Sequence, residues 1–319
     1  MTVGSELRFV PDGERDAGQV RRWRGDFGLH AALAPLMGMQ PVFERLLRDA
    51  LAHARQGAAG FWLPQPYALR RFGTRLDLTV PASAVGALLF DGVDVADPLI
   101  VHPASAAPKV STDSGRAAPR GRLFHTGHWF IGAGDWSPIL LPFARHQVSR
   151  EAQELAAADL RFRDTPVYAR YRRRAEAGKP MVRNRLVLDT PAAVDVYFEG
   201  FVALFESIRE HGLRRRAEFA GRRGWRAGGR RWLAELGEQD IGVALAAQGR
   251  LVKLPGGQHR FAIARALGLE AVPVQLRMLH VGALGDMSAS ALVGAIDAHG
   301  VWSLCNVGTA EDGRIIRAS

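Results

Sequence analysis

Residues 251–260 read LVKLPGGQHR, and residues 261–267 continue as FAIARAL. This order predicts a short strand, a turn built on two glycines, and a helix that ends before Gly268, since glycine commonly follows the last helical residue. The other predicted elements lie before and after this stretch.

Gly256 and Gly257 allow the backbone to turn tightly and leave N–H groups that point outward. His259 and Arg260 then fall in the first helical turn, where the helix dipole disfavours a cation. An anion held between these side chains and the free N–H groups removes the conflict. The stretch therefore predicts a phosphate-binding turn, and the alternative is an ordinary strand–helix connection with a solvated arginine.

The composition is that of a globular protein of one large domain or two modest ones. Of 319 residues, 47% are hydrophobic and 23% charged, and the net charge is +10. A basic balance permits nucleic acid or another polyanion as partner without requiring one. The single cysteine, Cys305, excludes a disulfide framework or a cysteine-based zinc site within one chain. No apolar run approaches membrane-spanning length and the N-terminus reads as no signal peptide, so we expect a cytoplasmic protein with no membrane partner.

The predicted fold class is α+β, in four parts: an N-terminal α/β region of unknown role (1–140), a helical connector (141–182), a domain that contains the glycine turn (183–280) and a C-terminal extension (281–319). In the first part we expect two helices within 27–55, the second from about Pro41, and strands at 75–80, 85–90 and 123–131. Residues 110–122, rich in Ser, Asp, Gly and Pro, predict a mobile loop.

The strand at 123–131, LFHTGHWFI, carries His125 and His128, and Asp135 follows. With His102 these residues suggest a metal site. Side chains alternate along a strand, however, so the two strand histidines face opposite ways. A half-buried strand with aromatic packing is therefore the favoured interpretation.

Two basic segments raise the question of nucleic acid. The helix predicted at 167–176 interleaves Tyr168 and Tyr171 with arginines, which suits base stacking or tyrosines packed over the core, and we favour the core. The segment 214–231 holds eight arginines and only one acidic residue, Glu218. Its glycines predict a flexible basic insert that could grip nucleic acid.

A strand at 184–189 and a long helix over 191–210 precede this insert, and strands at 241–246, 251–254 and 271–276 follow. The order of motifs is a helix ending in SIREHGL (207–213), a hairpin, GQHR (257–260) opening a helix, and LGLEAVPV (267–274). Over about residues 183–280 this order resembles the ParB N-terminal domain and its relative sulfiredoxin. The resemblance implies a ParB/sulfiredoxin-like fold in which the glycine–His–Arg turn holds nucleotide phosphates.

The chain departs from each branch of that superfamily. Gln258 stands where sulfiredoxins have their catalytic cysteine, which argues against sulfinic acid reduction. The residues after Leu276, RMLHVGALGDMSASAL, carry neither the Glu-Asn helix nor the helix-turn-helix of ParB proteins. The QHR order is nearest to the small-molecule kinases of the superfamily.

We therefore predict a nucleotide-binding protein that performs phosphoryl transfer or nucleotide hydrolysis. The alternatives are a non-enzymatic, nucleotide-switched or DNA-associated ParB-like regulator, and a degenerate domain that only scaffolds a partner. The nucleotide is expected to be CTP, ATP or ADP with Mg²⁺.

The expected site follows from this chemistry. The backbone N–H groups of Gly256, Gly257 and Gln258 would cradle phosphates, and His259 and Arg260 would stabilise developing charge. Asp189 and Asp195 are the expected catalytic carboxylates for Mg²⁺, with Glu199 nearby. Lys253 could reach the phosphates, although a strand lysine facing solvent is the favoured interpretation.

Overall fold

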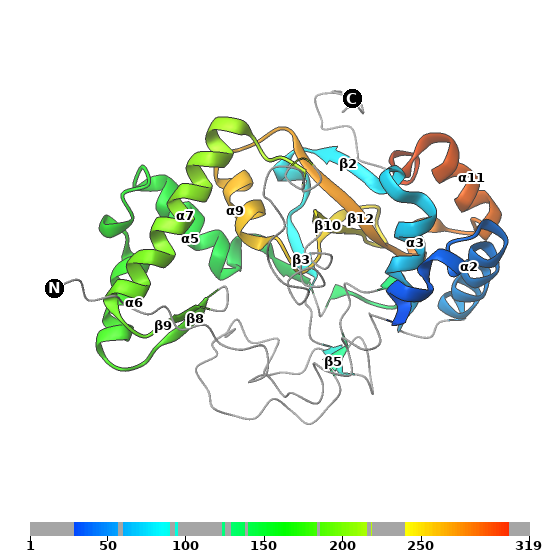
Figure 1. Ribbon diagram of the computed structural model, residues 1–319. Coiled ribbons are helices and arrows are strands. Elements are labelled where there is room, and N and C mark those ends of the chain that lie inside the picture. The colour runs from blue at the N-terminus through cyan, green and yellow to red at the C-terminus, as the bar shows by residue number, and fades with distance from the viewer. Residues whose placement is uncertain are drawn as a thin grey trace.

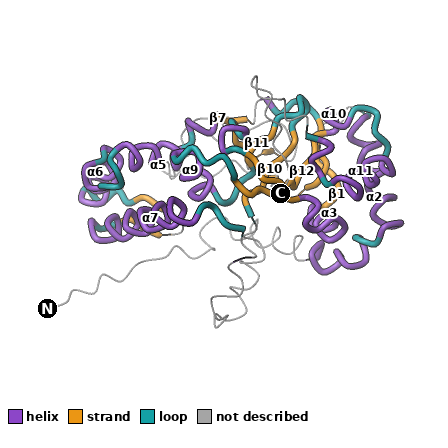
Figure 2. Tube along the Cα trace, turned by 90° about the horizontal axis from the view of Figure 1, so that it is seen from above, coloured by secondary structure: helices purple, strands orange, loops and turns teal. Residues whose placement is uncertain are grey.

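The computed structural model describes residues 29–56, 60–89, 93–94, 123–124, 129–137, 140–183, 186–215, 218 and 240–305. Helices and strands are mixed, and a mixed sheet lies at the centre with helices at both ends (Figures 1 and 2). The fold is thus of the predicted mixed α and β kind. None of the helices in these ranges is both long and apolar enough to cross a bilayer.

Eight strands of the described residues form the central sheet, in the order β1-β6-β12-β10-β11-β3-β7, with β2 also paired to β12. Their bounds are β1 Gly60–Pro64, β2 Asp77–Val80, β3 Ala87–Leu89, β6 Trp129–Ala133, β7 Leu140–Pro142, β10 Ile241–Leu245, β11 Leu251–Lys253 and β12 Val272–His280. Two small hairpins lie apart from it, β4 Val93–Asp94 with β5 Leu123–Phe124, and β8 Met181–Arg183 with β9 Leu186–Leu188.

The longest strand, β12, organises this sheet. It runs parallel to β10, with Ile241 opposite Val274, and pairs antiparallel with β2 and parallel with β6. It continues to His280, four residues beyond the predicted end at Leu276. The prediction stopped too early because Arg277 interrupts the apolar pattern. In the fold its guanidinium is buried and donates to the backbone oxygen of Asp240, so the strand continues through it.

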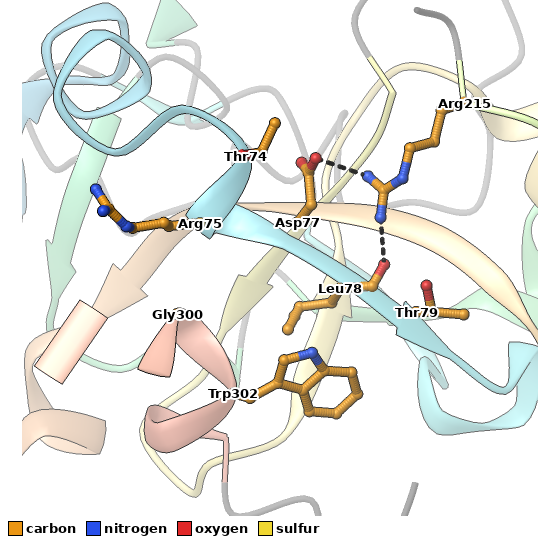
Figure 3. Close-up of a pocket in the computed structure, with 8 residues that line it drawn as sticks. All are labelled: Thr74, Arg75, Asp77, Leu78, Thr79, Arg215, Gly300 and Trp302. Carbon is orange, nitrogen blue, oxygen red and sulfur yellow. Dashed lines mark hydrogen bonds and ion pairs between the residues drawn. The ribbon is translucent and has the colours of Figure 1, made fainter. Parts of the chain in front are cut away.

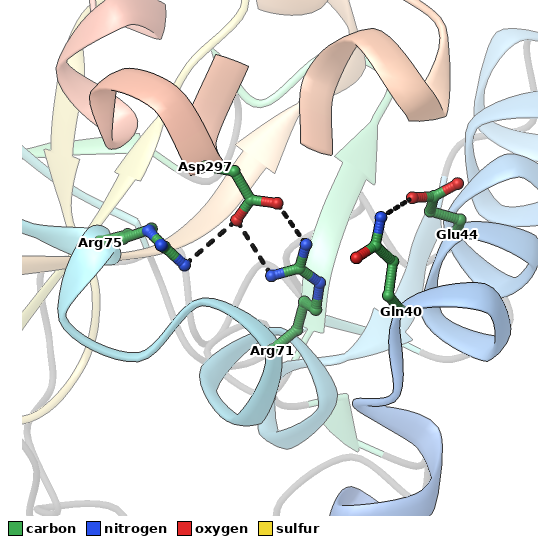
Figure 4. Close-up of polar contacts among 5 residues, drawn as sticks. All are labelled: Gln40, Glu44, Arg71, Arg75 and Asp297. Atoms are coloured by element: carbon green, nitrogen blue, oxygen red, sulfur yellow. Dashed lines mark hydrogen bonds and ion pairs between the residues drawn. The ribbon is translucent and has the colours of Figure 1, made fainter. Parts of the chain in front are cut away.

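The central sheet joins distant parts of the chain. Strands β1, β2, β3, β6 and β7 come from the first 142 residues, whereas β10, β11 and β12 come from residues 241–280. Helix α11 (Ala289–His299), from the C-terminal part, also packs beside α2 (Gln40–Arg55) and near α3 (Gln65–Phe72). Asp297 of α11 binds Arg71 and, at 3.2 Å, Arg75 (Figure 4). One core therefore includes residues from both the N-terminal and C-terminal regions.

A helical layer lies at the other end of the sheet (Figure 1). It contains α5 (Gln147–Ala157), α6 (Pro166–Glu176), α7 (Pro191–His211) and α9 (Gln258–Ala266). Thr165 and Thr190 cap α6 and α7 through their hydroxyl groups, and Gly212, at φ 69°, ends α7. Helix α5 ends at Ala157, and Asp159 and Leu160 after it adopt left-handed conformations.

Most other predicted elements of the described residues are confirmed, but the single strand predicted at 123–131 is wrong, because β5 at its start and β6 at its end belong to different sheets. The two helices of the first part are present at 29–37 and 40–55, and Tyr168 and Tyr171 are buried in the core as favoured. The candidate metal histidines His102, His125 and His128 lie outside the described residues, as do the predicted loop at 110–122 and all of the basic insert except residues 214, 215 and 218. Within the described ranges, no three His, Cys, Asp or Glu side chains form a group that could hold a metal.

Candidate functional site

The turn between β11 and α9 has the backbone that its two glycines predict. Gly256 (φ 94°) and Gly257 (φ 63°) both lie in the left-handed region, and both are exposed. Gly257 is the N-cap of α9 and supplies no side-chain hydrogen bond. The first N–H groups of a helix have no acceptor within it, so those of α9 are left for solvent or a ligand. We call residues 256–260 the GGQHR turn.

Lys253 lies beneath this turn and is fully buried, so the favoured interpretation of a solvent-facing lysine is wrong. Strand β11 lies inside the sheet between β10 and β3, and all three of its residues are buried. The ammonium group donates to the backbone oxygens of Leu254, at 2.7 Å, and Gly256. Burial lowers the Lys253 pKa well below its usual value, and Arg277 and Arg260 lower it further.

This contact also orients the turn. In a trans peptide the N–H of a residue points opposite to the preceding carbonyl. Because the carbonyl of Gly256 points toward the Lys253 ammonium, the N–H of Gly257 points away from it. The lysine thus supports the turn from behind, with its charge close to the outward-facing N–H groups.

His259 is held by helix α7. Its Nε2 lies 3.1 Å from the hydroxyl of Tyr197, and its ring meets Phe201 edge-on, with the ring centroids 5.1 Å apart. Burial and, to a smaller extent, the neighbouring His146 and Arg183 lower the pKa of His259 to about 4. At pH 7 His259 is therefore neutral, and it does not supply the positive charge that the sequence suggested.

The Tyr197 hydroxyl connects His259 to a buried acid. Glu151 on α5 is fully buried, and its Oε2 accepts a hydrogen bond of 2.8 Å from Tyr197. Its Oε1 accepts from the hydroxyl of Tyr171 and lies 3.6 Å from Nε of Arg183. A buried carboxylate is tolerated only with such partners. We call Glu151, Tyr171, Arg183 and Tyr197 the Glu151 cluster.

Electrostatics within the cluster fix its protonation. Burial raises the pKa of both Tyr171 and Tyr197, and the charge of Glu151 raises it further. Both tyrosines therefore keep their protons at neutral pH and donate them to the carboxylate. Arg183, whose side chain is only 12% exposed, supplies the compensating positive charge.

The Glu151 cluster was not predicted from the sequence, because its members come from α5, α6, β8 and α7. One local signal was available. Glu151 lies three residues after Val148 and four before Leu155, both buried, so it falls on the apolar face of α5. An acid on such a face calls for a buried partner.

Arg260 reaches away from the cluster. Its guanidinium donates to the backbone oxygen of Arg214, at the start of the basic segment 214–231. The side chain is partly exposed, so it is accessible at the turn. The GGQHR turn is thereby connected to the first described residues of that segment.

Two of the carboxylates predicted in or near the site bind other side chains. Asp195 accepts a hydrogen bond of 2.6 Å from Tyr168 on α6. It precedes Tyr197 by two residues, which is about 200° around the helix, so it faces another way. Glu199 lies 3.8 Å from Arg163, with both side chains exposed. Asp189 is partly exposed just before α7 and has no hydrogen bond or ion pair within the described parts of the chain.

A separate polar cavity of about 210 Å³ lies beside β2 (Figure 3). Asp77 and Arg215 both line it and form an ion pair with each other at 2.9 Å, and Trp302 forms part of the wall. Burial raises the pKa of Asp77, an effect that Arg215 opposes. Arg215 follows the residue that binds Arg260, so the cavity and the GGQHR turn share one short segment of chain.

Comparison of the sequence with protein-family models, with curated proteins and with solved structures gave no match.

Proposed function

We propose that the GGQHR turn binds the phosphates of a nucleotide, and that the protein uses it for phosphoryl transfer or nucleotide hydrolysis. The observation that carries the proposal is the uncapped start of α9, which two left-handed glycines expose. Helix N-termini with free N–H groups and nearby cations favour phosphate groups. The resemblance of residues 183–280 to the ParB/sulfiredoxin superfamily supports the same role.

The charges around the turn suit a polyanion. Arg260 and buried Lys253 both lie close to it, and Lys253 has only backbone carbonyls as hydrogen-bond acceptors. A bound phosphate would offset the repulsion between these cations. Positioning and charge stabilisation are the main requirements of phosphoryl transfer, and both are available here.

Mg²⁺ would be expected to accompany a nucleoside triphosphate. Glu151 accepts hydrogen bonds from two tyrosines and forms an ion pair with Arg183. Asp195 accepts a hydrogen bond from Tyr168. Asp189 is the predicted carboxylate without a protein partner within the described residues, so it is the candidate ligand. Mg²⁺ usually takes one or two carboxylates together with phosphate oxygens, so one acid would be sufficient.

The proposal is tested by calorimetric titration of ATP, ADP, CTP and GTP, each with Mg²⁺. We expect one or more to bind the wild-type protein, and Arg260→Ala to weaken that binding at least about tenfold, since a charge-assisted hydrogen bond is lost. Arg250→Ala is the matched control, because Arg250 is exposed on the β10–β11 turn and has no side-chain partner in the described residues. Equal binding by the Arg260 and Arg250 variants would refute the assignment.

The alternative function is a nucleotide-switched DNA-binding regulator. It is favoured by the contact between Arg260 and the backbone of Arg214, because a ligand at the turn would act on the start of the arginine-rich segment. DNA binding through several arginines should weaken steeply with salt. If this function is correct, a bound nucleotide must change the affinity for DNA or the dependence of that affinity on salt concentration. A fluorescence-anisotropy titration of DNA measures both.

A further inference from the structure

Three side chains from three helices form a continuous hydrogen-bonded line to the GGQHR turn. Glu151 of α5 lies 2.8 Å from the hydroxyl of Tyr197 on α7, and that hydroxyl lies 3.1 Å from Nε2 of His259 on α9. The acid and the tyrosine are both buried, whereas His259 is partly exposed. The line therefore leads from the core to the ligand-facing side.

The hydrogens along this line can be assigned by counting. A tyrosine hydroxyl has one hydrogen, and the Glu151 carboxylate, which faces Arg183, has none to give. The Tyr197 hydrogen therefore goes to Glu151. The oxygen of Tyr197 can then act toward His259 only as an acceptor, so Nε2 of His259 must carry a hydrogen.

The consequence concerns the other ring nitrogen. In a neutral imidazole only one nitrogen carries hydrogen, so Nδ1 of His259 presents a lone pair. It has no hydrogen-bond partner in the described parts of the chain. Nδ1 of His146 also has no hydrogen-bond partner there, but it is fully buried. Nδ1 of His259 is not fully buried.

We propose that Nδ1 of His259 is the general base of the site, and that Tyr197 and Glu151 are positioning residues that hold its tautomer. This inference rests on the proposed function, because the base acts on the nucleophile that attacks a phosphate held by the turn. The nucleophile is water or the hydroxyl group of an acceptor substrate.

The step balances with a nucleoside triphosphate as the second reactant. The nucleophile oxygen forms a bond to the terminal phosphorus, and the bond from that phosphorus to the bridging oxygen breaks. The nucleoside diphosphate leaves with the electron pair, and the nucleophile proton moves to Nδ1. The Glu151 carboxylate, acting through Tyr197, stabilises the imidazolium that forms.

Several charged or titratable groups surround His259. His146, at the start of α5, and Arg183, on β8, both disfavour its protonated form, whereas Glu151 lies behind Tyr197. Lys253 of β11 lies near His146 and lowers the pKa of that histidine. Burial, together with these neighbours, keeps the base unprotonated until a proton is delivered to it.

The first test needs no ligand and no variant. Nitrogen-15 NMR of the histidine rings in the wild-type protein at pH 7 reports which nitrogen carries hydrogen. We expect the His259 signals to show a protonated Nε2 and an unprotonated Nδ1. A protonated Nδ1, or an imidazolium, would overturn the inference.

The second test uses a matched pair of variants. Tyr197→Phe and Tyr171→Phe each remove one hydroxyl that donates to Glu151, but only Tyr197 contacts His259. We expect Tyr197→Phe to give a mixture of His259 tautomers and to slow single-turnover cleavage of the nucleotide at least about tenfold. Tyr171→Phe should keep the wild-type tautomer, and nucleotide affinity should stay within about twofold in both variants.

The two proposals fail in different ways. If no nucleotide binds the wild-type protein, the proposed function is wrong and the base has no reaction, whatever the tautomer. If a nucleotide binds and is cleaved but the two tyrosine variants react equally fast, the positioning role is wrong while the phosphate-binding turn stands.

Discussion

The side-chain nitrogen of Lys253 donates a hydrogen bond to the backbone oxygen of Gly256, so a fully buried lysine lies directly beneath the exposed glycines of the GGQHR turn. Its second acceptor, the oxygen of Leu254, is also a backbone group. The arrangement joins the interior of the sheet to the surface where a ligand would bind. It also makes the turn sensitive to what happens at one buried side chain.

Replacing Lys253 should therefore change both binding and stability. Lys253→Met keeps the length of the side chain but removes its charge and both hydrogen bonds. We expect nucleotide affinity to fall about tenfold, because the turn loses its support and a nearby charge. Calorimetric titration measures this change, and Lys179→Met, which removes an exposed lysine, should leave affinity unchanged.

The same lysine predicts how stability depends on pH. Because its folded pKa is well below its usual value, the unfolded chain binds more protons than the folded protein between these two values. The contribution of Lys253 to stability should therefore rise as pH increases through that window, toward its ordinary value of about 10.4. We expect the free energy of unfolding of the wild type, relative to that of Lys253→Met, to be higher at pH 9.5 than at pH 7. Urea unfolding at the two pH values measures this difference. A constant difference between the two proteins would contradict this expectation.

Two neutral histidines predict a loss of stability in acid. Burial lowers the pKa of both His146 and His259 to about 4, below the ordinary value of 6.5. The unfolded chain binds more protons between these values, so stability falls as pH drops from 6.5 toward 4. For His259, which is partly exposed, the loss is at most about 3 kcal/mol, at about 1.4 kcal/mol for each pKa unit. His259→Gln should flatten this part of the curve in urea unfolding at pH 4.5, 5.5 and 7, whereas a curve as steep as that of the wild type would exclude the contribution.

Glu151 should be the acid on which stability depends most. Glu151→Gln leaves Arg183 and both tyrosines with a neutral partner that accepts through one oxygen only. Removing one member of a buried ion pair commonly costs about 3–5 kcal/mol, and we expect a loss near the lower end because the amide still accepts one hydrogen bond. The measurement is the free energy of unfolding in urea. Glu206→Gln, at an exposed position on α7, is the control and should change it by less than about 0.5 kcal/mol.

Two glycines should respond to alanine in opposite directions. A Cβ at Gly242 would lie 2.9 Å from Cδ of Arg277, so Gly242→Ala forces that side chain from its contact with Asp240. We expect a loss of about 1–3 kcal/mol, because a buried guanidinium is left poorly satisfied. A Cβ at Gly200, inside α7, meets nothing within 4 Å, so Gly200→Ala should stabilise the protein by about 0.5–1 kcal/mol. Thermal unfolding compares the two variants, and a stabilising Gly242→Ala would refute the packing argument.

Local sequence signals were sufficient for the turn and for most of the helices and strands around it. Thr165 and Thr190 cap their helices, Gly256 and Gly257 take positive φ, and α9 begins at Gln258 as predicted. These features depend on residues close together in the chain, such as a hydroxyl near a free N–H group or a glycine without a Cβ. Long-range packing hardly alters them.

Two of the wrong expectations share one cause. Lys253 was expected in solvent and β12 was expected to end before Arg277, because an isolated charge in a strand usually marks a surface or a strand end. Both residues are buried, and their charged groups bind backbone oxygens of Leu254, Gly256 and Asp240. Every residue has a backbone carbonyl group, so these hydrogen-bond partners cannot be predicted from the residue types in the sequence.

By itself, the sequence determined the GGQHR turn, its two left-handed glycines and the helix behind them, because turn and capping preferences act over a few residues. Only the tertiary structure decided what surrounds that turn. It placed Lys253 beneath the turn and brought Glu151, Tyr197 and His259 into one hydrogen-bonded line from three helices. The physical reason is that a buried charge takes its partners from whatever the packing of distant segments brings within hydrogen-bonding distance, and packing is a property of the whole chain.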